Sequence, residues 1–414
     1  MWGGSITSTI HGHHARVFDV AFSPTDSAVL ASASDDESCR VWRQDGSDTT
    51  QAASFHGHQD SVLRVSWAPC GTLLASASAD TTVRLWRVGN ADDDQQGPRF
   101  GAKEVQCLEG HPEEVYSCEF LDASTEAMQL ASCSEEKVFL WDVGTEKQLA
   151  SAGPPSDIQH EPTGYDIPTR WQPGHVFSLV AQPESGGILA GCCSDGSLRT
   201  WVRHDGALEP LKGLRLRNAM GSSCAWHQNG LHVALTFTSG DIAVVDIRTW
   251  CVVWEVKQSC PVFGCCYLPG SANALAVCGP SSSISIFDTS GDSSEGCQQH
   301  QPLRVLHESP SIAERHLLCV AAAPDGSAFA ASGNTISPPA RKADSFPQDS
   351  GASAGSVADD ADELFSSSGL EAFGRGAAQA ADPEHPGNVA LQHQAAKQSK
   401  WSPISHWRAN TISS

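Results

Sequence analysis

The chain has no long run of apolar residues. Its 414 residues are 40% hydrophobic, yet Ser, Gly, Asp or Pro interrupts each apolar stretch within a few positions. A membrane-spanning helix needs about 20 consecutive apolar residues, so the sequence argues against a membrane span and favours many short strands. Residues 1–5 also lack the basic and apolar regions of a signal peptide, so we expect a cytoplasmic or nuclear protein that is not secreted.

Basic residues are also scarce. The chain has 26 Lys and Arg against 48 Asp and Glu, a net charge of −22, and no basic cluster. Because nucleic acids and anionic membranes bind through such clusters, we expect no direct nucleic-acid partner. The chain also lacks a phosphate-binding Gly-rich loop and a Cys pair with zinc spacing near His11, His13 and His14, so no metal or other cofactor is expected. The 15 cysteines are dilute and mostly lie in apolar runs, which predicts reduced core residues.

A unit of about 40 to 45 residues repeats along the chain, a period typical of a four-stranded propeller blade. The first copy begins with Gly12 and His13 and ends with Val41 and Trp42. The second begins with Gly57 and His58 and ends with Trp86. Each copy has an Asp six residues before the Trp and an Ala-Ser-Ala-Ser run between the two motifs.

On these residues the chain resembles the WD-repeat (WD40) family over residues 1–333. The resemblance implies a hydrogen-bonded tetrad of His, Ser, Asp and Trp within a blade. The implied sets are His13, Ser32, Asp36 and Trp42, and His58, Ser76, Asp80 and Trp86. A buried carboxylate must be paired and an indole N–H needs an acceptor, so these sets favour a structural lock over a catalytic triad.

The predicted fold is an all-β propeller of nominally seven four-stranded blades, the seventh incomplete, with a disordered C-terminal tail. Blade cores are expected near residues 11–45, 56–90, 109–150, 174–205, 218–256, 260–290 and 304–333. Glu135 and Glu136 replace the turn Asp in copy three, and Gly191 replaces the Ser in copy four. Copy seven stops before its third strand, and residues 334–414 are rich in Ser, Ala, Gly, Gln and Asp, which predicts disorder. Residues 5–10 could supply the outer strand of the last blade, and a tail segment could fill its missing strand.

One position of the first strand is apolar or aromatic in six copies and marks a candidate partner site. In the WD-repeat family this position lies on the top face beside the central channel, where apolar side chains would form a docking ring. The ring residues are Phe18, Leu63, Tyr116, Phe177, Phe263 and Leu318. The alternative is that some of them pack between blades.

Two further segments are candidate binding sites. The insertion at residues 153–171 is expected over the top face, and its Tyr165, Arg170 and Trp171 are types common at interface hot spots. A solvated surface loop is the alternative. Asp246 and Arg248 resemble part of the box by which some WD-repeat substrate receptors bind a cullin-RING adaptor. Because only the Asp and the Arg match, an Arg that supports the blade edge is the favoured interpretation.

Together these features predict a non-catalytic scaffold that binds proteins or peptides on its top face within a multiprotein complex. A cullin-RING ubiquitin-ligase substrate receptor is the first alternative. A propeller hydrolase is the second, and it would need a polar cluster with perturbed pKa values in the channel, where we expect an apolar rim.

Overall fold

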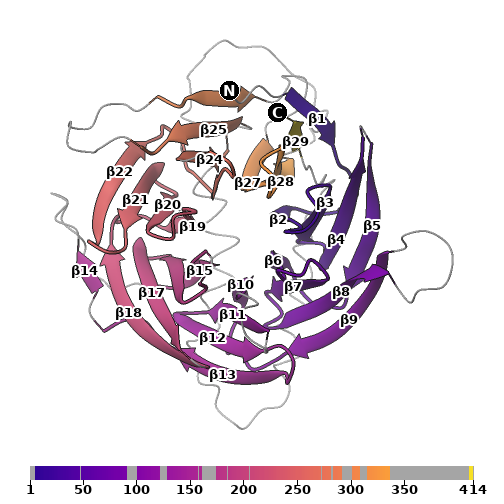
Figure 1. Cartoon of the computed structure of the whole chain (residues 1–414), viewed down its shortest axis with the longest axis horizontal. Coiled ribbons are helices and arrows are strands. Elements are labelled where there is room, and N and C mark those ends of the chain that lie inside the picture. Colours follow the sequence, from indigo (N-terminus) through magenta and orange to yellow (C-terminus); the bar gives the residue numbers. More distant parts are fainter. Residues whose placement is uncertain are drawn as a thin grey trace, which may run out of the picture. The chain divides into compact units, whose positions relative to one another are not determined.

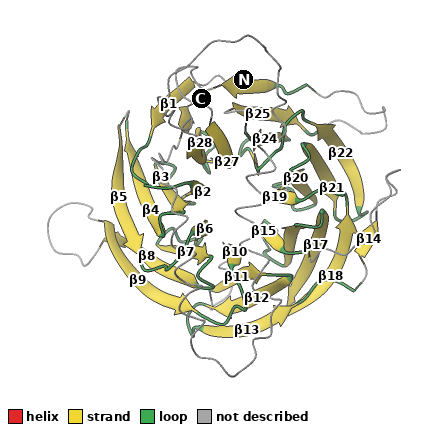
Figure 2. Ribbon diagram, turned by 180° about the vertical axis from the view of Figure 1, so that it is seen from behind, coloured by secondary structure: helices red, strands yellow, loops and turns green. Residues whose placement is uncertain are grey.

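The computed structural model forms a ring of β-sheets around a central channel (Figures 1 and 2). The residues that it describes are 5–46, 48–90, 100–121, 128–156, 158–160, 174–183, 185–204, 206–271, 273–280, 283–290, 301–307, 315–335 and 410–413. All regular elements among them are strands, arranged in seven sheets. No helix in these ranges is long and apolar enough to cross a bilayer.

Each sheet is a blade, and in blades one to six four consecutive antiparallel strands run from the channel to the periphery. Blades one to three comprise β2 (Val17–Phe22), β3 (Val29–Ser34), β4 (Ser38–Asp45) and β5 (Asp48–His56); β6 (Val62–Trp67), β7 (Leu73–Ser78), β8 (Val83–Asn90) and β9 (Phe100–Leu108); and β10 (Val115–Phe120), β11 (Gln129–Ser134), β12 (Lys137–Asp142) and β13 (Lys147–Ala152). Blades four to six comprise β15 (Val176–Ala181), β16 (Ile188–Cys193), β17 (Ser197–His204) and β18 (Ala207–Arg215); β19 (Gly221–Trp226), β20 (His232–Phe237), β21 (Asp241–Asp246) and β22 (Cys251–Lys257); and β23 (Gly264–Tyr267), β24 (Ala274–Cys278), β25 (Ser283–Asp288) and β26 (Arg304–His307).

The apolar core lies between neighbouring blades. The second strands β3 and β11 are buried at every position, because a strand in the middle of a blade is covered on both faces by adjacent blades. One cluster joins Val41 and Phe55 of blade one to Val65 and Trp86 of blade two. Further clusters join blade two to three, four to five, five to six, six to seven and seven to one. Small residues such as Ala31 and Ala33 let the sheets approach closely.

Both ends of the described chain meet in the seventh blade, whose strand order is β1 (Ser5–Thr9), β29 (Asn410–Ser413), β28 (Ala328–Thr335) and β27 (Arg315–Ala322). The N-terminal strand β1 is therefore the outer strand. The missing third strand is supplied by β29, which pairs with Ala328 and Phe329 of β28. Residues 410–413 and 334–335 thus belong to strands, whereas the rest of the tail predicted to be disordered lies outside the described residues.

Two blade boundaries differ from the sequence expectation. The segment Arg304–His307, assigned above to blade seven, pairs with β25 and forms the outer strand of blade six. Blade four contains a fifth strand, β14 (Ile158–His160), which runs parallel to β18. Gly213 permits this pairing, because a Cβ at that position would lie 2.9 Å from Cγ1 of Ile158.

The start of the insertion at 153–171 is therefore built into blade four. Residues 158–160 extend the outer edge of that blade, where the sequence analysis expected a segment lying over the top face. Residues 161–171, including Tyr165, Arg170 and Trp171, lie outside the described residues.

Candidate functional site

The top face is the end of the propeller that carries two sets of connections, those from each outer strand to the next inner strand and those from second to third strands. In blade one, these two connections are joined by His13. Its Nδ1 lies 2.9 Å from Oδ2 of Asp36, and its Nε2 lies 2.8 Å from Oγ of Ser32. The Trp42 indole N–H donates to the same Ser32 oxygen at 2.9 Å. The four residues of the first set therefore form one continuous network.

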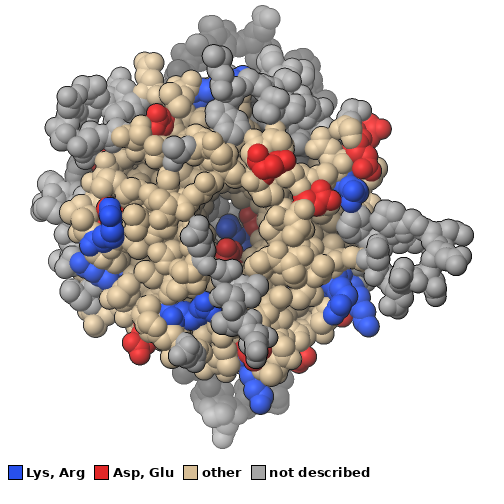
Figure 3. Space-filling model, viewed as in Figure 1, with Lys and Arg blue, Asp and Glu red and all other residues tan. Residues whose placement is uncertain are grey.

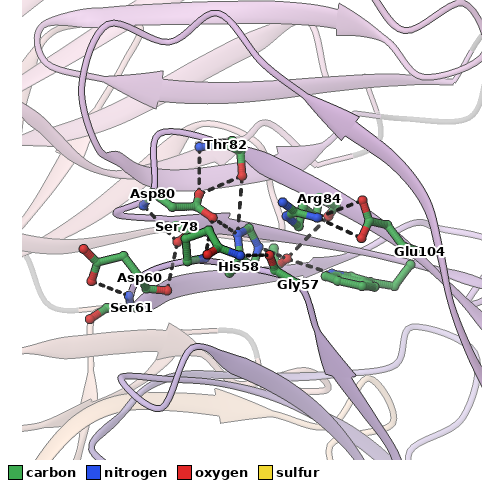
Figure 4. A network of polar contacts seen from close by, with 12 residues as sticks. Gly57, His58, Asp60, Ser61, Ser78, Asp80, Thr82, Arg84 and Glu104 are labelled. Carbon is green, nitrogen blue, oxygen red and sulfur yellow. Dashed lines mark hydrogen bonds and ion pairs between the residues drawn. The ribbon is translucent and has the colours of Figure 1, made fainter.

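Blade two repeats this geometry (Figure 4). His58 contacts Asp80 at 2.8 Å and Ser76 at 2.7 Å, while Trp86 donates to Ser76 at 2.8 Å. The Arg84 guanidinium, which lies beside this network, donates to both carboxylate oxygens of Glu104. Ser32 and Ser76 are fully buried, so no substrate can reach their hydroxyls, and this geometry suits a structural lock.

In both networks, hydrogen bonds keep the Asp carboxyl ionised. Burial alone would raise the pKa of the Asp36 carboxyl, but hydrogen bonds from His13, Ser38 and the His14 backbone outweigh burial and hold that pKa well below its usual range. The pKa of the His13 imidazole is lowered because burial disfavours the charged ring. Burial would likewise raise the pKa of the Asp80 carboxyl, but hydrogen bonds from His58 and Thr82 outweigh the effect of burial and hold that pKa well below its usual range.

Blade three retains only part of the set. His111 contacts Ser132 at 2.7 Å and Trp141 donates to Ser132 at 2.8 Å. The carboxylate of Glu136 turns away to blade four, where it accepts the Gly174 N–H at 2.8 Å. Phe139 packs edge-on against His111 instead, with a centroid distance of 4.9 Å.

Blade four satisfies its tryptophan differently. Gly191 offers no hydroxyl, and the Trp201 indole donates to the Gly153 carbonyl at 2.8 Å. Arg199 is buried and donates to Asp195 at 2.9 Å, with Glu136 of blade three at 3.5 Å. This arginine therefore ties two blades together through two carboxylates.

The six residues of the expected docking ring differ in burial. Phe18, Leu63, Phe177 and Leu318 are half-buried, whereas Tyr116 and Phe263 are buried, with 9% and 4% of their surface exposed. The Phe18 ring lies 5.3 Å beneath the Arg16 guanidinium. Tyr116 and Phe177 form an edge-to-face pair across the seam of blades three and four, with centroids 5.1 Å apart. Four of the six residues thus offer apolar surface, and Tyr116 mainly supports Phe177.

A charged cluster lies beneath this ring, inside the channel. Figure 3 shows atoms of both charge signs in the central hollow. The Arg64 Nε lies 3.5 Å from Asp19 Oδ2, and Glu119 lies 3.3 Å from the Ser66 hydroxyl. Burial raises the pKa of Glu119 to about 7, although Arg64 opposes the shift. The expectation of an apolar channel was therefore incomplete.

The sequence contained a signal for this cluster. Asp19 and Arg64 occupy the same position in copies one and two, and Glu119 lies two positions later in copy three. Cys319, at the Asp19 position of blade seven, donates its thiol to Asp19 at 3.0 Å. Burial raises the pKa of that thiol well above its usual value, so it stays protonated and is a poor nucleophile.

The same position of the inner strands connects neighbouring blades. The Asp19 carboxylate accepts the Val65 N–H at 2.9 Å, and the hydroxyls of Ser117 and Ser178 accept the N–H groups of Leu179 and Cys224 at 3.2 and 3.4 Å. An inner strand has no strand partner on its channel side, so its N–H groups need such acceptors. These bonds hold the inner ring of strands in fixed positions.

The possible adaptor box lies at the end of β21. Arg248 donates from Nε and Nη2 to the two oxygens of Asp246 at 3.1 and 2.6 Å. The Asp246 carboxylate is 7% exposed and the Arg248 side chain 60% exposed. These hydrogen bonds, with a smaller opposing effect of burial, lower the pKa of Asp246 to about 2. The arginine thus folds back on its own turn.

Comparison with known proteins identifies the first blades. The family model described as WD domain, G-beta repeat matches residues 4–43, 49–87 and 102–142. A 72-residue segment is 43% identical to protein transport protein sec13 of Aspergillus clavatus, covering 17% of this chain and 24% of that protein. A 69-residue segment is 33% identical to the probable cytosolic iron-sulfur protein assembly protein Ciao1 of Culex quinquefasciatus, covering 16% and 20%. A 64-residue segment is 33% identical to coronin-7 of Rattus norvegicus, covering 16% and 7%. The chain thus matches at most about a quarter of the length of these relatives.

Proposed function

From the premise that this chain is a WD40-repeat β-propeller, we propose that it is a non-catalytic scaffold that binds protein or peptide partners on its top face. One observation carries the proposal. Phe18, Leu63, Phe177 and Leu318 come from the inner strands of four different blades, and all are half-buried. In the WD-repeat family this position lies at the mouth of the channel, and partly exposed apolar side chains gathered on one face are typical of partner sites.

The bonds between inner strands support a scaffold role. Acceptors such as Asp19 and Ser117 connect inner strands to the next blade, which helps the ring residues to keep fixed relative positions. A pre-organised surface loses little conformational entropy on binding. The names of two matched relatives refer to protein transport and to iron-sulfur protein assembly, and both tasks involve other proteins.

The test is a triple variant of the ring, Phe18→Ser, Leu63→Ser and Phe177→Ser. The matched control carries Leu149→Ser and Leu211→Ser, which change side chains that are 39% and 50% exposed on the outer strands β13 and β18. Both proteins are first compared by circular dichroism and thermal unfolding. In affinity purification with mass spectrometry, the ring variant is expected to lose partners that the control retains. Full retention of partners by a folded ring variant would reject the proposal.

The substrate-receptor alternative has less support. An adaptor-binding arginine must be available to a partner, and the Arg248 guanidinium already donates two hydrogen bonds to Asp246. Its test is adaptor binding by Arg248→Ala, which this alternative predicts to be lost. The hydrolase alternative finds a channel cluster with a perturbed pKa, since burial raises the pKa of Glu119 to about 7. Burial also keeps the Cys319 thiol beside Asp19 protonated, so this cluster contains no activated thiol nucleophile.

A further inference from the structure

The top face carries an excess of carboxylates on blades one to three. They lie in the connections before β2, β6 and β10 and in the turns after β3 and β11. The group comprises Asp35, Glu37, Asp60, Glu113, Glu114 and Glu135. Arg16 is the only Lys or Arg in these connections and turns. This sector of the channel mouth is therefore acidic as well as apolar.

Three of these carboxylates crowd one another on adjacent connections. Burial raises the pKa of Glu114, and the charges of Glu113 and Asp60 raise it further. No Lys or Arg in the described part of the chain forms an ion pair with any of the three. A cation placed here would relieve their mutual repulsion.

Blade five differs from blades one to three because its carboxylates form ion pairs with Arg and Lys side chains of the same blade. In blade five, Arg217 lies 3.6 Å from Asp241 and 2.5 Å from Glu255, and Lys257 lies 2.8 Å from Asp241. The turn residue that is Glu37 in blade one is Gly196 in blade four and Gly240 in blade five. Among the described residues, the carboxylates of blades one to three thus carry a negative charge, whereas blade five balances the charge of its carboxylates with its own cations.

Blade one shows how this surface accommodates a guanidinium. Arg16 lies over the Phe18 ring at 5.3 Å and pairs with Asp35 at 3.2 Å. The seam of blades three and four has matching components. Phe177 is half-buried against Tyr116, and the Tyr116 hydroxyl lies 3.5 Å from Glu114. There the described part of the chain supplies the ring and the carboxylates but no cation.

We propose that the mouth over blades one to four binds an arginine-containing basic segment of a partner protein, with one arginine against Phe177 beside Glu113 and Glu114. This inference rests on the proposed docking function and names its partner class. A guanidinium suits the site better than an ammonium, because it stacks on a ring and donates to a carboxylate at the same time. An apolar residue elsewhere in the segment would contact Leu63 of blade two.

The test uses two fluorescein-labelled octapeptides, one with three arginines and a leucine, the other with citrulline in place of each arginine. Citrulline has nearly the same shape but no charge. Binding to the full chain is measured by fluorescence anisotropy at low and high salt. The arginine peptide is expected to bind about tenfold tighter at low salt, a difference of about 1.4 kcal/mol, and to lose that advantage as salt screens the charges.

The decisive variant is Glu113→Gln with Glu114→Gln. Its matched control is Glu146→Gln with Glu209→Gln, which removes the same charge at the opposite end of blades three and four. The first is expected to weaken binding of the arginine peptide about tenfold, and the control less than twofold. Equal binding of the two peptides, or equal losses in both variants, would overturn the inference.

The two proposals can fail separately. If the arginine peptide shows no preference while the ring variant still loses its cellular partners, the basic partner class is wrong and the scaffold proposal stands. If the arginine peptide requires Glu113 and Glu114 while the ring variant keeps every partner, the docking ring itself is wrong.

Discussion

Blades two and four bury the same tryptophan position by different means. Trp86 donates to a serine of its own blade, whereas Trp201 donates to the Gly153 carbonyl in the connection from blade three. Both indoles are buried, and a buried N–H needs an acceptor wherever one can be found. Blade two is therefore locked internally, and blade four is locked to its neighbour.

The arginine two positions before each tryptophan follows the same division. Arg84 is 17% exposed and pairs with Glu104 of its own blade. Arg199 is 1% exposed and bridges Asp195 to Glu136 of blade three. A repeat can therefore lose its internal hydrogen-bond network and remain ordered, if a neighbouring blade supplies the missing partners.

The largest effect is expected from Arg199→Leu. This change leaves Asp195 buried without its cation, which costs about 3 to 5 kcal/mol of unfolding free energy. The matched Arg84→Leu change removes the ion pair with Glu104, whose carboxylate already contacts water, so its cost is about 1 kcal/mol or less. Guanidinium unfolding of both variants measures the difference. Similar losses in the two variants would show that blade four is not specially dependent on its arginine.

The next largest effect is a loss of folding stability at acid pH that comes from blade three. Its His111 is equivalent to His58 of blade two but has no Asp partner among the described residues. Burial lowers the pKa of His111 to about 4, partly offset by the Thr81 backbone. The unfolded chain therefore binds a proton below about pH 6.5 that the folded chain excludes until about pH 4. Stability must fall as pH falls through this window, by no more than about 3 to 4 kcal/mol, since each pKa unit is about 1.36 kcal/mol.

Replacement of His111 by Gln removes this term and retains a group that can bond Ser132. The variant is expected to lose less stability than the parent chain between pH 7 and pH 4.5 in urea unfolding. The exposed His14→Gln change provides the control. Parallel pH profiles for the parent and the His111 variant would contradict the assignment.

Ser76→Ala tests the internal lock of blade two. The change removes the common partner of His58 and Trp86 and strands a buried indole N–H, at a cost of about 2 kcal/mol. Ser54→Ala on the outer strand of blade one is a suitable control, because its hydroxyl contact with His56 is exposed. Thermal unfolding should separate the two, and equal midpoints would count against the lock.

The smallest effect comes from restoring the family serine in blade four. Gly191→Ser is expected to destabilise by about 1 to 2 kcal/mol, because a Cβ there would lie 2.8 Å from Val176 and 2.9 Å from the Trp201 ring. The new hydroxyl gains little, since Trp201 already has an acceptor. A stabilised variant would mean that blade four can return to the pattern of blade two.

Much of the fold could be predicted from repeats. The spacing of Gly12, His13, Asp36 and Trp42 recurs because every blade solves the same packing problem, so its motif repeats in the sequence. The exposure of the docking-ring residues was predicted less well. Phe18 and Phe263 occupy equivalent positions, yet one is half-buried and the other buried, since burial depends on the side chains of the neighbouring blades.

The sequence by itself determined the seven-blade plan and the two complete polar sets, because these depend on local spacing within one repeat. The residues that replace the missing tetrad partners in the later blades follow only from how the blades pack in three dimensions. The bridge from Arg199 to Glu136, the donation from Trp201 to Gly153 and the contact of Asp19 with Cys319 join residues of different blades. Asp19 and Cys319 are 300 residues apart in sequence. A repeat motif carries no information about such contacts, because they arise from the packing of neighbouring blades and, for Asp19 and Cys319, from the closure of the ring.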